Sequence, residues 1–247
     1  MLFSRTSLLL ALSAAVAAVP HRKEHWSDHN AWGVNKAPQY GHQNIAPSCN
    51  VAAVQMPAAP KPLPPPAAGL SLYHVAVGRG TQNYTCDLSN STAVPAAIGA
   101  VASLWNATCL SANSPMLLNK VPNIALELPT PDVTIESTAA YKDLSGHHYF
   151  SDLTTAYFDL NTAVGKYSAG GFKKVNATAA PTDAAKGQNG KGYGAVPWLK
   201  LQSKNSEGCV FKEIYRINTA GGQPPATCTG QKAAFEIEYS AEYWFYA

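Results

Sequence analysis

Short runs of β-favouring residues, separated by turn residues, follow one another from residue 70 to residue 247. The most regular run is residues 235–239, where Phe, Ile and Tyr alternate with two glutamates. Alternation of this kind is typical of a strand with one buried and one wet face. Because Gly, Pro and Asn separate the runs and no βαβ rhythm appears, we expect one all-β domain over residues 70–247, an antiparallel sandwich or barrel with one or two short helices.

The pattern is less decisive at a few places in this domain. Residues 93–109 suit a helix or a strand, and residues 116–128 predict a short helix interrupted at Pro122. The loop 177–193, rich in Gly, Lys, Ala and Asp, is the best candidate for a mobile surface segment. The predicted strands are residues 70–77, 81–86, 133–136, 148–150, 156–160, 171–175, 195–202, 210–218 and 234–246.

The N-terminal end predicts export. Arg5 precedes an apolar run over residues 7–19, which is shorter than the roughly 20 residues that cross a bilayer, and small residues follow at 15–18. We therefore expect residues 1–18 to be a signal peptide and the protein to be secreted, outside the cell or in its wall. Residues 19–69 lose all periodicity and include PAAPKPLPPP at 57–66, which predicts a disordered propeptide or linker.

Charge and hydropathy exclude two classes of partner. The net charge is +3 with no dense basic patch, so no nucleic-acid partner is expected. After the leader, no segment has about 18 uninterrupted apolar residues, so no membrane span is expected.

The chain has five cysteines, at 49, 86, 109, 209 and 228. They lack the C-x-x-C and Cys/His spacings of zinc sites, so outside the cell they predict disulfides. Four lie in the domain. Pairing of sequence neighbours would join Cys86 to Cys109 and Cys209 to Cys228; the other two pairings stay open, and Cys49 is left over as a free or intermolecular thiol.

Four sequons for N-glycosylation add to the prediction of export. Their asparagines are Asn83, Asn90, Asn106 and Asn176. A glycan on any of them would require that asparagine to face solvent.

Motifs for known chemistry are incomplete. Gly78-Arg79-Gly80 follows a predicted strand, but Asn83 stands where a dinucleotide loop needs its third glycine, so no cofactor is expected. The sequence has no Gly-x-Ser-x-Gly elbow, no His-Glu-x-x-His helix and no phosphate loop.

Polar residues around residue 150 form the densest set of candidate catalytic groups: Asp143, His147, His148, Asp152 and Asp159. If His148 and Asp159 lay on neighbouring strands, they could share a proton, whereas His147 would point to the other face. No metal site is expected. Arg216, in a predicted strand, would need a carboxylate or carbonyls when buried, and could equally hold a substrate anion.

Four aromatic residues are candidates for stacking on sugar rings: Tyr193, Trp198, Tyr243 and Trp244. Aromatic side chains at such positions also serve as core residues.

Several segments, in this order, resemble one known family. They are Gly78-x-Gly80-x-Gln82-x-Tyr84-x-Cys86, Gly146-His147-His148-Tyr149, Ala195-Val196-Pro197-Trp198-Leu199, Arg216-x-x-Thr219-x-Gly221-Gly222-x-Pro224-Pro225 with Cys228, and Tyr239-Ser240-Ala241-Glu242-Tyr243-Trp244-Phe245-Tyr246. The family is a group of secreted fungal and bacterial proteins catalogued as domain of unknown function 3455, and the resemblance to its fungal branch spans about residues 70–247.

The family passes on no established activity. Some fungal members are labelled malate dehydrogenase, which the residues oppose, because hydride transfer needs a cofactor site that is absent here. Our leading hypothesis is a non-enzymatic binding module of the cell surface, wall or matrix, whose partner is a carbohydrate or a surface protein. The alternative is a secreted hydrolase that uses His148, Asp159 and Arg216 in one pocket.

Overall fold

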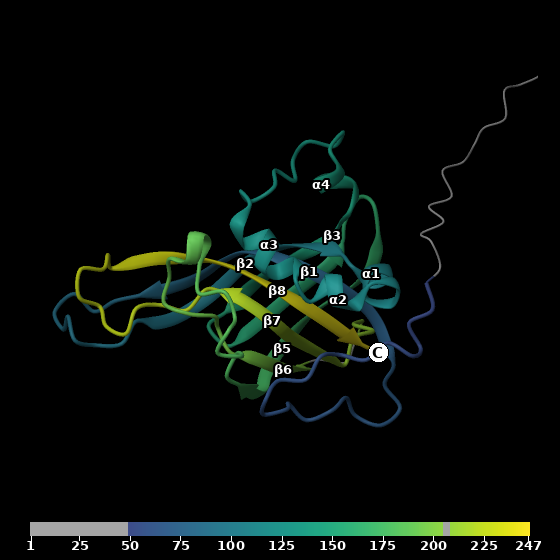
Figure 1. Cartoon of the computed structure of the whole chain (residues 1–247), viewed down its shortest axis with the longest axis horizontal. Helices are drawn as coiled ribbons and strands as arrows, with labels where there is room; N and C mark the ends of the chain where they lie inside the picture. Colours follow the sequence, from purple (N-terminus) through teal and green to yellow (C-terminus); the bar gives the residue numbers. More distant parts are fainter. Residues whose placement is uncertain (1–48, 205–207) are drawn as a thin grey trace, which may run out of the picture. The chain divides into compact units, whose positions relative to one another are not determined.

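The computed structural model describes residues 49–204 and 208–247 (Figure 1). The predicted signal peptide, residues 1–18, and residues 19–48 of the predicted linker lie outside the described residues.

The strands of the described chain form a closed antiparallel barrel. They follow one another around it in sequence order, and β1 pairs with β8 to close it. The all-β prediction is confirmed, and the architecture is a barrel rather than a sandwich. The strands are β1 Leu72–Thr85, β2 Ala96–Asn106, β3 Leu144–Asp152, β4 Thr155–Asn161, β5 Lys166–Thr178, β6 Trp198–Ser203, β7 Glu213–Gly221 and β8 Ala234–Tyr246.

Short helices lie between β2 and β3. They are α1 Thr108–Asn113, α2 Pro115–Leu118, α3 Val121–Glu127 and α4 Ala139–Lys142, and a 3-10 turn, η1 Gln188–Gly190, follows in the loop after β5. Pro115 and Pro122 each stand in the first turn of a helix, where a missing N–H costs nothing. Pro122 therefore lies at the start of α3 instead of interrupting a longer helix. None of the helices in the described residues is long and apolar enough to cross a membrane.

Three sequence-based assignments differ from the structure. The predicted strands 70–77 and 81–86 are one continuous strand, β1, which runs through Gly78 and Gly80 without a turn. The ambiguous segment 93–109 contains the whole of strand β2 and then enters α1. The predicted strand 133–136 is not formed, because the Asp132 carboxylate accepts hydrogen bonds from the backbone N–H and the hydroxyl of Thr134 and turns the chain there.

Apolar side chains close one end of the barrel interior. Phe211, Ile214 and Phe245, which we call the apolar plug, are fully buried and belong to one interior cluster. Ile214 lies opposite Phe245 in the β7–β8 ladder, and the Phe211 and Phe245 rings are 5.0 Å apart. Because inward and outward residues alternate along each strand, the residues next to the plug on the same faces are Arg216 and Tyr243.

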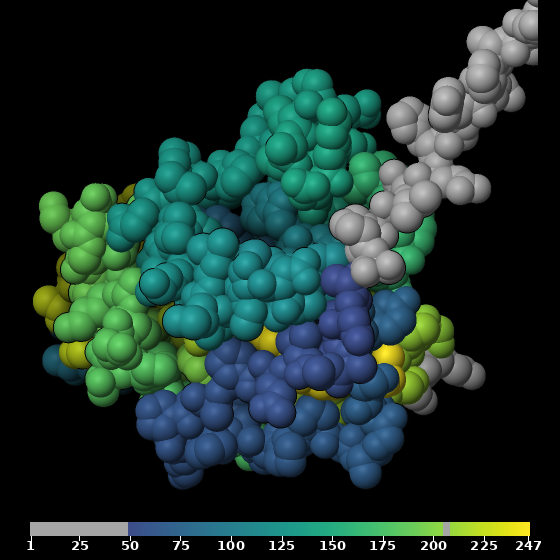
Figure 2. All heavy atoms as spheres, turned by 45° about the vertical axis from the view of Figure 1, so that its right-hand side comes forward, coloured from purple at the N-terminus to yellow at the C-terminus, as the bar shows by residue number. Residues whose placement is uncertain are grey.

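A second apolar cluster covers the outside of the barrel. Outward residues of β7 and β8, including Tyr215, Ile217 and Trp244, pack with Leu118 of α2 and with the N-terminal described segment. Helix α3 contacts β1, β7 and β8. The helices and residues 49–70 thus share the covering of this outer face, and they lie next to each other in Figure 2.

Residues 49–70 run along the barrel, and we call them the strap. Ala59 is buried there, and two strap carbonyls accept hydrogen bonds from barrel side chains: Pro64 from the Tyr215 hydroxyl at 2.9 Å, and Pro65 from Lys200 Nζ at 2.8 Å. The second part of the predicted disordered linker therefore packs as an extended segment. Side chains of β6 and β7 supply partners that a proline-rich chain cannot find within itself.

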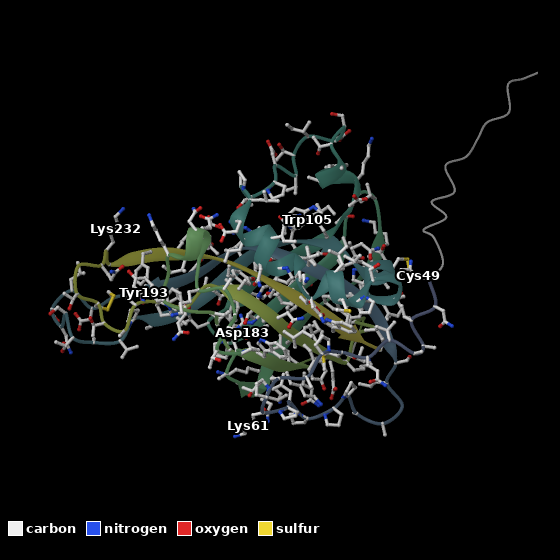
Figure 3. The ribbon with its side chains drawn as sticks, viewed as in Figure 1. Cys49, Lys61, Trp105, Asp183, Tyr193 and Lys232 are labelled. Atoms are coloured by element: carbon white, nitrogen blue, oxygen red, sulfur yellow. A yellow bond between two sulfur atoms is a disulfide. The ribbon has the colours of Figure 1, made fainter. Side chains whose placement is uncertain are left out.

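The disulfides differ from pairing of sequence neighbours. Cys49 is bonded to Cys109 of α1, and Cys86 to Cys228, while Cys209 is buried and free among the described cysteines (Figure 3 labels Cys49). The reason is topological. Strand β8 returns beside β1, so Thr85 pairs with Ala234 and Cys86 meets Cys228 across 142 residues of sequence. Neither of the sequence-neighbour pairs, Cys86–Cys109 and Cys209–Cys228, is formed, and the expectations that Cys209 is bonded and that Cys49 is left over were wrong.

Candidate functional site

A cavity of about 700 Å³ occupies the barrel interior beyond the apolar plug. Each of the strands β1 to β8 contributes at least one lining residue, so the cavity belongs to the barrel itself and not to a surface loop. Eight-stranded barrels are just wide enough to be filled by side chains or to hold one small ligand, and this volume lies within the range of small-molecule sites.

Arg216 and Tyr243 form the floor of the cavity. They are opposite each other in the β7–β8 ladder, and both line the cavity, whereas Ile214 and Phe245, two residues along each strand, belong to the plug. The floor is therefore polar and rests directly on apolar side chains.

The Arg216 guanidinium is buried without a counter-charge among the described residues. Its side chain belongs to a residue that is 8% exposed, and its Nη2 donates to the Pro197 carbonyl at 3.0 Å. No described carboxylate forms an ion pair with it, and its Nε has no hydrogen-bond acceptor in the described part of the chain. A buried cation usually has such a partner, because desolvation of an unpaired charge is costly.

His148 enters the cavity as a neutral ring. It is 3% exposed and stacks on Phe158 with ring centroids 4.2 Å apart. Burial, and to a lesser degree the Arg216 charge, lower the pKa of His148 to about 4 against the opposing effect of the Tyr157 carbonyl. His148 Nδ1 lies 3.0 Å from this carbonyl oxygen, which can only accept, so Nδ1 carries the proton and Nε2 is left as an acceptor.

The phenols near the floor keep their protons. The Tyr239 and Tyr243 hydroxyls are 2.8 Å apart, and burial raises the pKa of both side chains. For Tyr243 the charge of Arg216 and a hydrogen bond with it work in the opposite direction. Tyr84 donates to the Gly222 carbonyl at 2.8 Å, and burial raises its pKa to about 12.

The walls are apolar and the mouth is basic. Phe158, Phe172 and Leu201 are buried wall residues, and the exposed residues that line the mouth include Lys173, Lys174 and Lys204. No carboxylate lines the cavity among residues 49–204 and 208–247. Near the mouth, Asp152 is engaged locally, because it accepts hydrogen bonds from Thr154 and Thr155 that hold the pKa of its carboxyl well below the usual range.

Three of the residues singled out from the sequence meet in this cavity: His148, Arg216 and Tyr243. Asp159 does not join them. It pairs in register with His147 on the other face of the sheet, where its carboxylate accepts from the Asn161 N–H at 3.0 Å, and His148 lies opposite Phe158 instead. A His148–Asp159 pair is therefore absent from the described structure.

The four candidate sugar-stacking aromatics do not form one surface. Trp198 and Trp244 are 2% and 1% exposed in the outer cluster, where Trp244 Nε1 donates to Glu242 Oε2 at 2.8 Å. Tyr243 lines the cavity, and Tyr193 is exposed in the loop between β5 and β6 (Figure 3).

The sequon asparagines differ in exposure. Asn90, Asn106 and Asn176 are exposed, whereas Asn83 in β1 is half-buried. The Asn106 amide nitrogen donates to the Tyr167 hydroxyl at 3.2 Å.

Sequence reasoning missed the cavity walls and the basic mouth. Phe158 and Phe172 lie within predicted strands, and their inward parity could have been read from alternation with polar neighbours. Gln82 and Tyr84, on the inward face of β1, were noted only as parts of a motif. In the described chain, no group of three or more His, Cys, Asp or Glu side chains is arranged to hold a metal ion.

The fold and the cavity define a class. In the described residues, the protein is an eight-stranded antiparallel barrel with an internal cavity that the apolar plug closes at one end. A family model described as "Protein of unknown function (DUF3455)" matches residues 66–247, which is more than half of the chain. The chain belongs to this family, as its motifs had indicated. No curated protein and no solved structure matches the chain.

Proposed function

We propose that this protein is an exported binding module that holds one small molecule inside its barrel. The observation that carries the proposal is the cavity of about 700 Å³, lined by all the strands, with buried aromatic walls and a few convergent polar groups on its floor. Concave sites of this size, mostly apolar with few polar groups, are the usual form of small-molecule sites.

Export is supported by the apolar N-terminal run, the sequons and the two disulfides. Disulfides persist mainly in oxidising compartments. One of these joins the end of β1 to the segment before β8, and the other fastens the strap to α1.

A binding function is favoured over hydrolysis. The cavity is also a better candidate for the ligand site than a surface of aromatic side chains that stack on sugars. His148 has no carboxylate partner in the described residues to orient it as a general base, since Asp159 is on the other face. Trp198 and Trp244 are used as core residues on the outside of the barrel. The apolar cavity walls fit a ligand with an apolar body better than they fit a sugar.

The test is saturable binding of a neutral apolar fluorophore, N-phenyl-1-naphthylamine. We expect binding to the wild-type protein and about tenfold weaker binding after Ala177→Trp, which places a large ring among the exposed lining residues at the mouth. The matched control is Ala179→Trp, at an exposed position that does not line the cavity. Thermal unfolding of both variants checks the fold. Wild-type protein that gives no saturable signal, or variants that behave alike, would refute the proposal.

A further inference from the structure

We infer that the ligand is an apolar monocarboxylate, aromatic or acyl, with its carboxylate on Arg216 and its body against the wall that Phe158 and Phe172 form. This inference rests on the proposed binding function and names the class of ligand. It is carried by a charge that the described protein does not neutralise and by the chemistry of the walls around it.

Arg216 supplies the charge. Guanidinium has five donors and matches a carboxylate in a two-pronged geometry. In the described chain, Nη2 donates a hydrogen bond to the Pro197 carbonyl, and Nε has no acceptor. A ligand carboxylate on this group would pair the buried charge and supply the missing acceptor.

The groups beside Arg216 also favour an acceptor over a donor. The Tyr239 and Tyr243 phenols stay protonated because burial raises the pKa of both, so the pair can donate a hydrogen bond. The Gln82 amide, in a residue that is 8% exposed and lines the cavity, lies beside the Tyr239 hydroxyl, and its nitrogen carries two N–H donors. Apart from His148 Nε2, which is an acceptor, the polar groups around the floor are N–H and O–H donors, which is what an oxyanion needs.

The positions of the basic side chains favour a ligand whose head group carries one negative charge. One guanidinium stands on the floor, whereas Lys173, Lys174 and Lys204 stand at the exposed mouth. A doubly charged phosphate on the floor would bring more negative charge than Arg216 offsets. The lysines, at the entrance, raise the local concentration of anions and increase their rate of entry.

The walls select the body of the ligand. Phe158 and Phe172 are fully buried and meet edge to face at 5.7 Å, and Leu199 and Leu201 line the cavity beside them. Contact with these side chains removes apolar surface from water, which favours rings or an acyl chain over a sugar or a peptide.

The experiment compares 2-naphthoate with its neutral amide, 2-naphthamide, by displacement of N-phenyl-1-naphthylamine and by direct calorimetry. We expect wild-type protein to bind the carboxylate at least about tenfold more tightly. Arg216→Met should remove this preference while the neutral fluorophore still binds, and Arg216→Lys should restore part of it. Lys166→Met is the matched control, because Lys166 is an exposed lysine of β5 that does not line the cavity, and it should keep the preference.

The outcomes separate the two proposals. If the fluorophore binds but the carboxylate has no advantage over the amide, the ligand class is wrong and the binding function stands. If neither the fluorophore nor the naphthalene ligands bind, both fail. Should Arg216→Met not fold, the wild-type ratio of the two affinities still decides, since equal affinities overturn the inference. Decyl phosphate is included, and tighter binding of it than of decanoate would also overturn the choice of a monocarboxylate.

Discussion

Cys86, directly after β1, is bonded to Cys228, which precedes β8, and the bond closes a loop of 142 residues. The second bridge, from Cys49 to Cys109, closes 60 residues and fastens the strap to α1. Both bonds act across contacts that are remote in sequence, so both restrict the unfolded chain strongly.

Removal of either bridge should therefore destabilise the fold. The chain-entropy model gives about 5 kcal/mol for the longer loop and about 4 kcal/mol for the shorter one, at the upper end of measured values. We expect Cys86→Ser with Cys228→Ser, and separately Cys49→Ser with Cys109→Ser, to lower the free energy of unfolding by about 2–5 kcal/mol in urea denaturation. Cys209→Ala is the control, and it should remain as sensitive to reductant as the wild type because Cys209 is in neither bridge.

The buried ion pair between Lys200 and Glu213, next to the strap, predicts that a single substitution destabilises the fold more than a double one. Lys200 Nζ lies 3.0 Å from Glu213 Oε1, and both side chains are nearly excluded from solvent. Glu213→Gln leaves the Lys200 charge unpaired and should cost about 3 kcal/mol of unfolding free energy. Lys200→Met combined with Glu213→Leu should cost much less, because it leaves no buried charge. Equal losses for the single and the double variant would contradict this account.

His148 predicts a loss of stability in acid. Its pKa is about 4 in the folded protein and 6.5 in the unfolded chain. Between these values the unfolded chain binds a proton that the folded protein does not, so the free energy of unfolding falls as the pH falls from 6.5 to 4. The difference amounts to about 3 kcal/mol.

The measurement is chemical denaturation at pH 7.5 and pH 4. His148→Gln should remove about 3 kcal/mol of the wild-type pH dependence. His147→Gln is the matched control, because His147 is the adjacent residue on the exposed face. The remaining pH dependence should include His74, whose pKa burial also lowers to about 4. A pH profile that is the same in His148→Gln and wild type would rule out this role.

The packing around Gly146 predicts how much stability is lost when a single methyl group is added to the barrel wall. A Cβ at this position would overlap the carbonyl oxygen of Asp159 on β4, which is backbone and cannot rotate away. Gly146→Ala should therefore destabilise the protein by about 3 kcal/mol, through forced separation of β3 and β4. Gly69→Ala, where the space is open and only the positive φ is strained, should cost about 1 kcal/mol. Similar melting temperatures for the two variants would count against this explanation.

Most of the individual strands could be predicted from the sequence, although β1 was expected as two strands and β2 was left open, but the closure of the barrel could not be predicted. Alternation over residues 235–239 identifies a half-buried strand, and it contains no information on which strand is its neighbour. The pairing of β8 with β1 joins the two ends of the domain and decides between barrel and sandwich. The same long-range contact determines the Cys86–Cys228 bond, which is why pairing by sequence distance was wrong.

The candidate site could be predicted from the sequence only in part, for a similar reason. Arg216 and His148 were identifiable as polar residues in predicted strands, but the partner of His148 depends on register. The turn between β3 and β4 places Phe158 opposite His148 and Asp159 opposite His147. The ordered conformation of the strap could not be predicted for another reason. Its proline-rich composition predicts disorder, and its order comes from Tyr215 and Lys200, which donate to its carbonyls.

Because β1 pairs with β8, each strand of the described barrel has its backbone hydrogen-bonding partners on both sides. Such a sheet offers little template for a foreign strand to be added. A macromolecule that docks on the barrel wall would have to recognise side chains and covering segments rather than main-chain amides, so changes in surface residues should alter the choice of partner without touching the ladder that holds the cavity open.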